Sequence, residues 1–475
     1  MGSPGGSRPR TLPLQSNGMR AMMRRRTLLQ AAASTAVVGC GGGGGQGAEV
    51  NAPPAAVKPN VLMIAIDDLN DWTGYLTGHP QVKTPHLDAL AARSTVFERA
   101  YCNSPTCSAS RPSALTGLSI QSTGVWAEDQ TFHEVNPGKD MLWGMMTKGG
   151  YESTLFGKVN HQFSLGPQPM PTGTQPFANR QCFSSKGPGA FDWGPTQGDD
   201  SEHPDYRFAQ QGIDTINAPH TKPFFLAVGF VRTHVGWYVP QRFFDMYPKD
   251  QIYIPQPPDD DLNDLGPTGK AIAEQWDFHN CITRQGLWAD AVQAYLASIS
   301  WVDSQVGRLI NALNNSPHAN NTMIVLWSDN GFHLGQKFHW MKQALWEEST
   351  RVPFLISLPK QTSSVRQSAC VSLRDMTPTI LDYCQVAPSY SMDGVSLRPL
   401  IESPTQAWNR PVLTTHNEFD NAIRTERWRY IRYENGEREL YDVQADSAEH
   451  NNLAGLAGYE AIMADLERYM PPRRA

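Results

Sequence analysis

The stretch NVLMIAIDDLND, residues 60–71, is a continuous apolar run that stops at two aspartates. An unbroken apolar run of this length is typical of a strand buried on both faces of a parallel sheet. Residues 153–157, 224–231 and 323–327 have the same form, and each run is also followed by ionisable side chains. We therefore predict four core strands that end in chemically capable residues.

Helical patterns separate these runs. Residues 84–93 begin with a Thr-Pro pair that suits a helix start, and residues 288–314 place apolar side chains at helical spacing, with Asp303 and Arg308 expected to face outward. Helices that alternate with buried strands predict an α/β fold with a mainly parallel central sheet covered by helices on both faces. In such sheets, ligands bind beyond the carboxyl ends of the strands.

Other regions have loop or hairpin patterns. Residues 166–205 and 255–269 are rich in proline, glycine and polar residues, which is typical of long surface loops. We interpret the acidic run 259–261 as part of a solvated loop rather than a metal site. Residues 428–433 and 438–443 alternate apolar and polar side chains on either side of a turn, which predicts a hairpin in a smaller antiparallel sheet near the C-terminus.

Length and charge restrict the class of protein. A chain of 475 residues with 40% hydrophobic content can build a large core without disulfide staples. Its formal net charge is −6, and no basic run occurs beyond the N-terminus. A nucleic-acid partner is not expected, because a phosphate-binding surface needs clustered Lys and Arg.

The N-terminal residues 1–40 have the pattern of an export signal. Three arginines, 24–26, precede a short apolar run that ends in VVGC at Cys40. The arginines followed by TLL resemble a twin-arginine signal, and VVGC resembles a bacterial lipobox; an ordinary secretory peptide is the alternative. Residues 41–58 form a Gly, Ala and Pro-rich tether. We expect an exported bacterial protein that is periplasmic or anchored to the membrane by a lipid.

Export also permits disulfide bonds. The remaining cysteines are widely spaced, and no CxxC pair indicates a zinc site. Cys370 with Cys384 is one candidate bridge, although the sequence does not decide the connectivity.

Two pairs of oxygen donors follow two of the predicted strands, Asp67 with Asp68 and Asp329 with Asn330. Taken singly, such a pair is more often a helix cap and a solvated loop residue than a set of metal ligands. Together at one sheet edge the carboxylates would repel each other unless a cation lay between them. Because hard divalent cations take oxygen ligands, we predict a calcium or magnesium site.

The stretch SPTCSASRPSALTG, residues 104–117, places Cys107 where a helix is expected to begin, with Pro112 in its first turn. The amide-rich end of a helix attracts anions and lowers the pKa of a thiol, which suits a sulfate or phosphate substrate. Cysteine-dependent phosphatases use this logic with an arginine six positions after the cysteine, whereas Arg111 follows Cys107 by four. A buried structural cysteine is the alternative.

The CSASR motif followed by SALTG resembles the signature of type I sulfatases, which belong to the alkaline phosphatase superfamily. The usual form is CxPxR followed by a Thr-Gly turn, and Ala109 stands here in place of the proline. In that family the cysteine is oxidised to formylglycine, whose aldehyde hydrate attacks the substrate. The resemblance runs from residue 60 to about residue 453 through the motifs NVLMIAIDDLND, GKVNH, RTH, SDNG, HWMK and RELYDV.

The resemblance implies a role for each matching residue. Ca²⁺, with Mg²⁺ as the alternative, would be held by Asp67, Asp68, the modified Cys107, Asp329 and Asn330. Lys158 and Lys342 would bind the sulfate, and Arg111 would hold the hydrate. His234 would protonate the leaving oxygen, and His161 would assist breakdown of the intermediate.

Several histidines have a second interpretation. Without the resemblance, His161 and His234 would more readily be interpreted as surface residues or as residues that support the site from behind. His333 and His339, close to Asp329 in the chain, could contact substrate or pack in the core. The three-residue gap between Lys158 and His161 is that of iduronate-2-sulfatase-like members.

The resemblance implies an alkaline phosphatase-like catalytic domain, residues 59–385, and a C-terminal subdomain, residues 386–475. The expected activity is removal of O-sulfate from a sulfated saccharide, after modification of Cys107 by a formylglycine-generating enzyme. If export is by the twin-arginine route, this modification must come first, in the cytoplasm. The alternatives are a phosphodiesterase or phosphonate monoester hydrolase of the same superfamily, and a carbohydrate-binding lipoprotein with an inactive site.

Overall fold

The computed structural model describes residues 58–161, 182–183 and 190–473. The predicted export signal, with its lipobox, and all of the tether except Lys58 lie outside the described residues. Within the described part of the chain, no helix combines the length and apolar character needed to cross a membrane.

Seven strands form the central sheet: β1 (Asn60–Ile66), β2 (Thr95–Tyr101), β3 (Glu152–Gly157), β7 (Phe224–Phe230), β9 (Thr322–Ser328), β12 (Phe354–Ser357) and β13 (Val365–Ser372). Their order is β13-β2-β12-β9-β1-β7-β3, and neighbours are parallel except where β12 pairs with β9 and β2. The four predicted core strands are β9, β1, β7 and β3, which lie side by side. The prediction of a mainly parallel sheet is confirmed.

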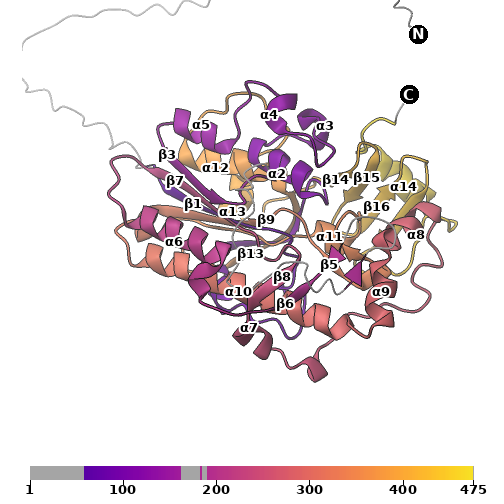
Figure 1. The fold of residues 1–475 in the computed structure, drawn as a ribbon. Helices are drawn as coiled ribbons and strands as arrows, with labels where there is room; N and C mark the ends of the chain where they lie inside the picture. Colours follow the sequence, from indigo (N-terminus) through magenta and orange to yellow (C-terminus); the bar gives the residue numbers. More distant parts are fainter. Residues whose placement is uncertain (1–57, 162–181, 184–189, 474–475) are drawn as a thin grey trace, which may run out of the picture. The chain divides into compact units, whose positions relative to one another are not determined.

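Helices cover both faces of this sheet (Figure 1). One face carries α1 (Pro85–Ala91), α6 (Pro204–Asn217) and α10 (Trp288–Asn314); the other carries α2 (Cys107–Thr116), α5 (Leu142–Lys148), α12 (Met376–Cys384) and α13 (Arg398–Glu402). Even-numbered residues of β1 from Leu62 to Ile66 pack in the first core, and odd-numbered residues from Val61 to Ala65 pack in the second. This alternation explains why the strand is apolar at every position.

A separate antiparallel sheet near the C-terminus confirms the predicted hairpin. Its strands pair in the order β14 (Val412–His416), β15 (Asp420–Arg424), β16 (Trp428–Arg432) and β17 (Arg438–Asp442), and α14 (Glu460–Glu467) packs against them. The exact boundary near residue 385 stays a prediction.

Short elements complete the described fold. The helices are α3 (Ile120–Thr123), α4 (Phe132–Val135), α7 (Gln241–Asp245), α8 (Pro267–Ala273), α9 (Phe278–Arg284) and α11 (Glu347–Thr350). The strands are β4 (Cys182–Phe183), β5 (Ala190–Phe191), β6 (Trp193–Thr196), β8 (Trp237–Pro240), β10 (His333–Leu334) and β11 (Trp340–Met341). Part of the predicted loop 166–205 is thus structured, as β4, β5 and β6; residues 162–181 and 184–189 lie outside the description.

The prediction that Asp303 faces outward from α10 is wrong. Its carboxylate is 2% exposed and accepts hydrogen bonds from the backbone N–H groups of His86, at 3.3 Å, and Leu87, at 2.7 Å. These are free N–H groups in the first turn of α1, and Thr84 makes no side-chain cap. Arg308 is partly buried, with its guanidinium carbon 3.6 Å from the ring centre of Tyr206.

The interpretation of the acidic run 259–261 as fully solvated is also wrong at its last residue. Asp259 and Asp260 are exposed, but Asp261 is 3% exposed and pairs with Lys337 Nζ at 2.9 Å. A buried lysine from a short 3-10 helix, Gln336–Phe338, supplies the counter-charge that burial of this carboxylate requires.

The candidate Cys370–Cys384 disulfide is wrong, because both cysteines are free and buried. The bridge instead joins Cys182 to Cys281, with Cα atoms 5.8 Å apart. These residues are 99 positions apart in the chain, and they meet because β4 packs against α9.

Candidate active site

The two predicted pairs of oxygen donors meet at the carboxyl edge of the central sheet. Strands β1 and β9 are parallel neighbours with Ile66 opposite Ser328, so the residues that follow them lie side by side. The backbone N–H of Asp68 donates to Asp329 Oδ1 at 3.1 Å, and Asn330 Nδ2 donates to Asp68 Oδ1 at 2.9 Å.

Helix α2 brings Cys107 and Arg111 to this edge. The helix begins at Cys107 itself, so Pro112 lies in the second turn. The prediction that Pro112 lies in the first turn is wrong. Arg111, fully buried, donates through Nη2 to Asp67 Oδ1 and through Nε to Asp329 Oδ2, both at 2.8 Å. It therefore ties together the ends of both strands one turn after Cys107.

Cys107 Sγ lies at the centre of the predicted residues. It is 3.3 Å from His161 Nδ1 and 3.6 Å from Lys342 Nζ. Burial raises the pKa of the thiol, and Lys342 and Lys158 only partly oppose this effect. The expected lowering of the thiol pKa at the helix start is therefore wrong, because burial outweighs the nearby positive charges. An unmodified Cys107 would be a poor thiolate nucleophile.

Both predicted sulfate-binding lysines reach the site. Lys158 Nζ is 2.5 Å from Asp67 Oδ2, and Lys342 Nζ is 2.5 Å from Asp68 Oδ1. Burial alone would lower the pKa of each lysine, but the neighbouring carboxylates raise it above the ordinary value. Both side chains are thus positively charged near neutral pH. Each ammonium has three N–H donors, and its contacts within the protein leave at least one of them for a further anion.

The two predicted histidines lie on the open side of the site. His234 Nδ1 faces the Val235 carbonyl at 2.6 Å, so Nδ1 carries the proton in the neutral ring. His234 Nε2 lies 3.8 Å from Asp68 Oδ2, and the side chain is 33% exposed. Burial lowers the pKa of both histidines, that of His161 to about 4.

The donor set fits a hard divalent cation. Two buried oxygens, Asp68 Oδ2 and Asn330 Oδ1, have no hydrogen-bond partner among the described residues. Ligand atoms of Asp67, Cys107 and Asp329 also lie within 4.8 Å of one another. Burial raises the pKa of Asp329 to about 6, whereas Lys158 and Arg111 overcome burial and hold the pKa of Asp67 well below its ordinary value. Unsatisfied acceptors beside crowded carboxylates are what a calcium or magnesium ion would satisfy.

Several residues that hold the backbone of the site in place were not predicted from the sequence. The backbone carbonyl of Asp67 accepts hydrogen bonds from the N–H and the hydroxyl of Thr233, at 2.9 and 3.0 Å. Tyr295 OH donates to the Asp68 carbonyl at 2.8 Å, and Ser110 Oγ donates to the Asp329 carbonyl at 2.6 Å. Thr233 and Ser110 flank motif residues, which is the only signal that could have found them; nothing in the local sequence marks Tyr295.

His333 and His339 are packed inside the protein. Both are fully buried; His333 Nδ1 is 2.8 Å from Ser349 Oγ, and His339 Nε2 is 2.9 Å from the Lys342 carbonyl. Their contacts support the packing alternative.

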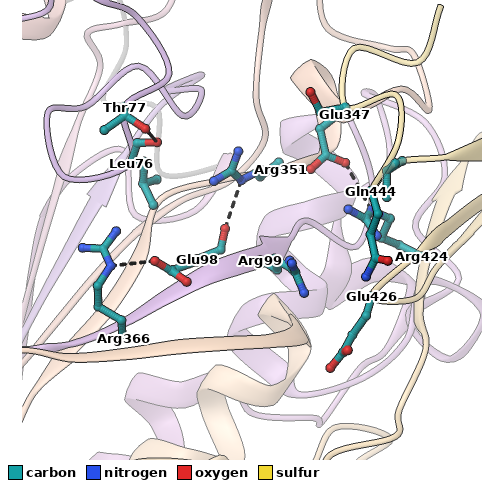
Figure 2. A pocket seen from close by; sticks show the side chains of 12 residues that line it. Leu76, Thr77, Glu98, Arg99, Glu347, Arg351, Arg366, Arg424, Glu426 and Gln444 are labelled. Carbon is teal, nitrogen blue, oxygen red and sulfur yellow. Dashed lines mark hydrogen bonds and ion pairs between the residues drawn. The ribbon is translucent and has the colours of Figure 1, made fainter.

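A second group of charged residues lies between the central sheet and the C-terminal sheet. We call Glu347, Arg424, Arg429 and Glu449 the C-terminal charge cluster. Arg429 pairs with both glutamates and donates to the Leu345 carbonyl at 2.8 Å, while Arg424 Nε lies 3.3 Å from Glu347 Oε2. A cavity of about 630 Å³ adjoins the cluster (Figure 2); none of the predicted catalytic or metal-binding residues lines it.

Comparison with known proteins places the chain among enzymes that act on sulfate esters. The family described as Sulfatase matches residues 59–386, and the family described as N-sulphoglucosamine sulphohydrolase, C-terminal, matches residues 335–474. A sulfatase of Formosa agariphila is 32% identical over 88% of this chain and 87% of its own length. Human iduronate 2-sulfatase is 28% identical over 68% of this chain and 64% of its own length.

Solved structures share the fold. A phosphonate monoester hydrolase of Agrobacterium radiobacter has a TM-score of 0.72 and 20% identity, covering 87% of this chain and 94% of that chain. A protein solved with its substrate D-glucosamine-2-N,6-O-disulfate has a TM-score of 0.69 and 22% identity, covering 87% and 96%. At these identities the likeness establishes the alkaline phosphatase-like fold and no particular substrate.

Proposed function

The chain belongs to the sulfatase family of sulfuric ester hydrolases, and we propose that it removes O-sulfate from a saccharide with an aldehyde hydrate made from Cys107 and with a divalent cation. The observation that carries this proposal is the position of Cys107. Its Sγ lies among two lysines, a histidine and two carboxylates, yet burial raises the pKa of the thiol. The surroundings suit a nucleophilic oxygen better than a thiolate.

The conversion to formylglycine removes one sulfur and two hydrogens from the side chain of Cys107 and adds one oxygen. It needs an external oxidant and a maturation enzyme, which we propose recognises the CSASR segment before folding, because Cys107 and Arg111 are both buried in the folded protein. Water then adds to the aldehyde to give two hydroxyl groups on one carbon.

The cation would be held by Asp67, Asp68, Asp329, Asn330 and residue 107, and when bound it supplies positive charge that makes the nucleophilic hydroxyl more acidic. We propose Ca²⁺, with Mg²⁺ as the alternative, because every candidate ligand from the two strand ends is an oxygen.

The remaining steps use the side chains of this protein. Lys158 and Lys342 bind the sulfuryl oxygens while one hydroxyl of residue 107 attacks sulfur and gives its proton to the nearby Asp329 carboxylate. The bond between sulfur and the sugar oxygen breaks in the same step. The imidazolium form of His234 carries a second proton on Nε2, beside the Asp68 carboxylate, and it gives this proton to the departing sugar oxygen. His161, next to residue 107, removes the proton from the second hydroxyl, so that sulfate leaves and the aldehyde forms again. Arg111 holds this arrangement through Asp67 and Asp329.

A saccharide is the substrate class we favour, because one matched relative is named iduronate 2-sulfatase. The alternative of a phosphonate monoester hydrolase can be tested directly. Para-nitrophenyl sulfate should be hydrolysed with a higher kcat/KM than the phosphate and phosphonate esters of the same phenol; the opposite preference would refute the proposal.

We also propose that the protein is exported, as a periplasmic protein or as a lipoprotein anchored through Cys40. The Cys182–Cys281 disulfide supports an oxidising compartment. In cell fractions, the wild type should leave the cytoplasm and a double Arg25→Lys, Arg26→Lys variant should stay there. Equal distribution of the two proteins would contradict the twin-arginine route.

Mass spectrometry of the peptide that contains Cys107 tests the central proposal. Protein from the native host should show loss of one sulfur and two hydrogens and gain of one oxygen, and its activity should scale with the modified fraction. Cys107→Ser protein, prepared in parallel, controls for chemical damage to the peptide. Full activity with an unmodified thiol would refute the mechanism.

A further inference from the structure

His416 stands at the end of β14, and the described residues offer no hydrogen-bond partner to its ring. Nδ1 is buried without a hydrogen bond among the described residues, and Nε2 also contacts no donor or acceptor there. Burial, together with nearby His339, lowers the pKa of His416 to about 4, so the ring is neutral near pH 7. A half-buried neutral imidazole without partners is costly unless a ligand or water bonds to it.

The strand that carries His416 runs along the segment leading to Cys107. Thr414 Oγ1 donates to the Cys102 carbonyl at 2.7 Å, and the Thr415 N–H donates to the Asn103 carbonyl at 2.9 Å. The next residue in β14 is His416, and Cys107 follows Asn103 by four positions. The end of β14 therefore stands beside the approach to the nucleophile.

Gln343 bonds to the same lead-in segment and directly follows the sulfate-binding Lys342. The Gln343 N–H donates to the Pro105 carbonyl at 3.1 Å. Its backbone has φ 71°, an uncommon conformation for a residue other than glycine. Such strained conformations gather at functional sites, where surrounding contacts hold them in place.

Trp276 joins this group through its neighbour Gln275, whose Nε2 donates to Gln343 Oε1 at 3.1 Å. Trp276 is partly buried, has φ 69°, and its Nε1–H is buried without a hydrogen-bond partner in the described structure. An indole offers a flat apolar face together with one N–H donor.

We propose that His416, Gln343 and Trp276 form a subsite that binds the sugar ring whose sulfate is removed. This inference rests on the proposed function and specifies how the leaving group is recognised. Imidazole, amide and indole N–H groups match the hydroxyl groups of a sugar, and the indole face matches the C–H face of its ring. All three groups are uncharged, so the subsite selects hydroxyl groups, while Lys158 and Lys342 bind the sulfate.

The test compares a saccharide with an aryl sulfate. For each variant, kcat/KM is measured on N-acetylglucosamine 6-sulfate, on galactose 6-sulfate and on para-nitrophenyl sulfate, which lacks sugar hydroxyls. In His416→Ala and in Trp276→Ala, we expect the ratio of saccharide to aryl activity to fall about tenfold, mainly through KM. His416→Gln, which keeps a hydrogen-bonding group, should recover part of the ratio.

The matched control is His133→Ala, because His133 is exposed in α4, outside the site; both activities should keep their wild-type values. An unchanged ratio in both His416→Ala and Trp276→Ala would overturn the subsite. So would wild-type protein that hydrolyses the aryl sulfate and neither sugar. Failure of aryl hydrolysis by aldehyde-bearing wild type would instead refute the proposed function, so the two failures are distinguishable.

Discussion

Two buried groups of charged residues meet the segment that carries Lys342, and they differ in what they leave unsatisfied. In the active site, Asp68 Oδ2 and Asn330 Oδ1 have no partner among the described residues. In the C-terminal charge cluster, by contrast, no polar side-chain atom of the four residues is buried without a hydrogen bond in the described structure.

The difference separates a binding site from a support. The C-terminal charge cluster uses its charges on itself and on the backbone: Arg429 donates to the Leu345 carbonyl, and Glu449 Oε2 accepts from the Glu347 N–H at 2.9 Å. Leu345 and Glu347 lie just beyond Lys342 in the chain, so the cluster fixes the segment that delivers this lysine. Charges paired within the protein hold structure, whereas leftover acceptors mark a place for a ligand.

The strongest way to break the active-site half of this comparison is Cys107→Ala. Loss of the proposed nucleophile should lower kcat/KM on para-nitrophenyl sulfate by ~10⁴ or more, because no other described side chain there can take its place. The free energy of unfolding, measured with urea, should change by only about 1 kcal/mol. Retention of a tenth of the activity would contradict the assignment.

Removal of divalent cations tests the leftover acceptors. After treatment with a chelator, kcat should fall by ~10³, because the positive charge of the proposed cation no longer makes the nucleophilic hydroxyl more acidic. Added Ca²⁺ should restore activity and stabilise the folded protein by about 2.7 kcal/mol at one hundred times its Kd. An activity assay would check the restored rate, and calorimetry would check the added stability. An Asp68→Asn variant with undiminished Ca²⁺ affinity would argue against the predicted ligand set.

Arg429→Met tests the C-terminal charge cluster. It leaves the Glu347 and Glu449 carboxylates buried with less counter-charge, which should cost about 3–5 kcal/mol of unfolding free energy in urea denaturation. Arg427→Met is the matched control, because Arg427 pairs with Asp442 on an exposed neighbouring position and should change stability by less than about 1 kcal/mol. Equal effects of the two variants would show that burial of the cluster has no special role.

Acid should weaken the C-terminal charge cluster in a defined range. Burial alone would raise the pKa of Glu347, but Arg424 and Arg429 outweigh it and lower the pKa to about 2. Because the folded pKa lies below the unfolded value of about 4.3, the contribution is complete above that value and is lost as the pH falls toward 2; it amounts to about 3 kcal/mol. The stability difference between wild type and Glu347→Gln should shrink over this range, and parallel pH curves would contradict it.

The smallest effect should come from Tyr101→Phe, which keeps the ring and removes one neutral donor to the cluster. Tyr101 OH donates to Glu347 Oε1 at 3.0 Å. Loss of this bond should cost about 1 kcal/mol, because Glu347 keeps both arginines. Urea denaturation beside Arg429→Met would rank the two contacts; a larger loss from Tyr101→Phe would reverse the ranking.

Much of the fold could be predicted because local patterns of apolar side chains indicate its strands and helices. Four continuous apolar runs became four neighbouring strands, and residues 288–314 became α10 with the same limits. The motif residues Asp67, Cys107 and Asp329 met in space because parallel strands present their carboxyl ends at one edge. Asp303 was misplaced because its partners, the first N–H groups of α1, are invisible to helical periodicity.

Pairings between distant segments needed the tertiary structure. Cys182 and Cys281 lie 99 positions apart, and their spacing shows no pattern. The burial of Asp261 depends on Lys337, and the support of Lys342 depends on a sheet that begins at residue 412. Such contacts are set by the packing of whole elements, which local spacing does not encode.

The sequence by itself determined the strands, the main helices and the identity of the residues at the strand ends, because these follow from the period of apolar side chains and from short motifs. Only the tertiary structure decided which charges are satisfied. It showed that burial raises the pKa of the Cys107 thiol and that one oxygen each of Asp68 and Asn330 has no hydrogen-bond partner within the described part of the chain. Burial and counter-charge are properties of the packed molecule, since they depend on every segment that surrounds a group.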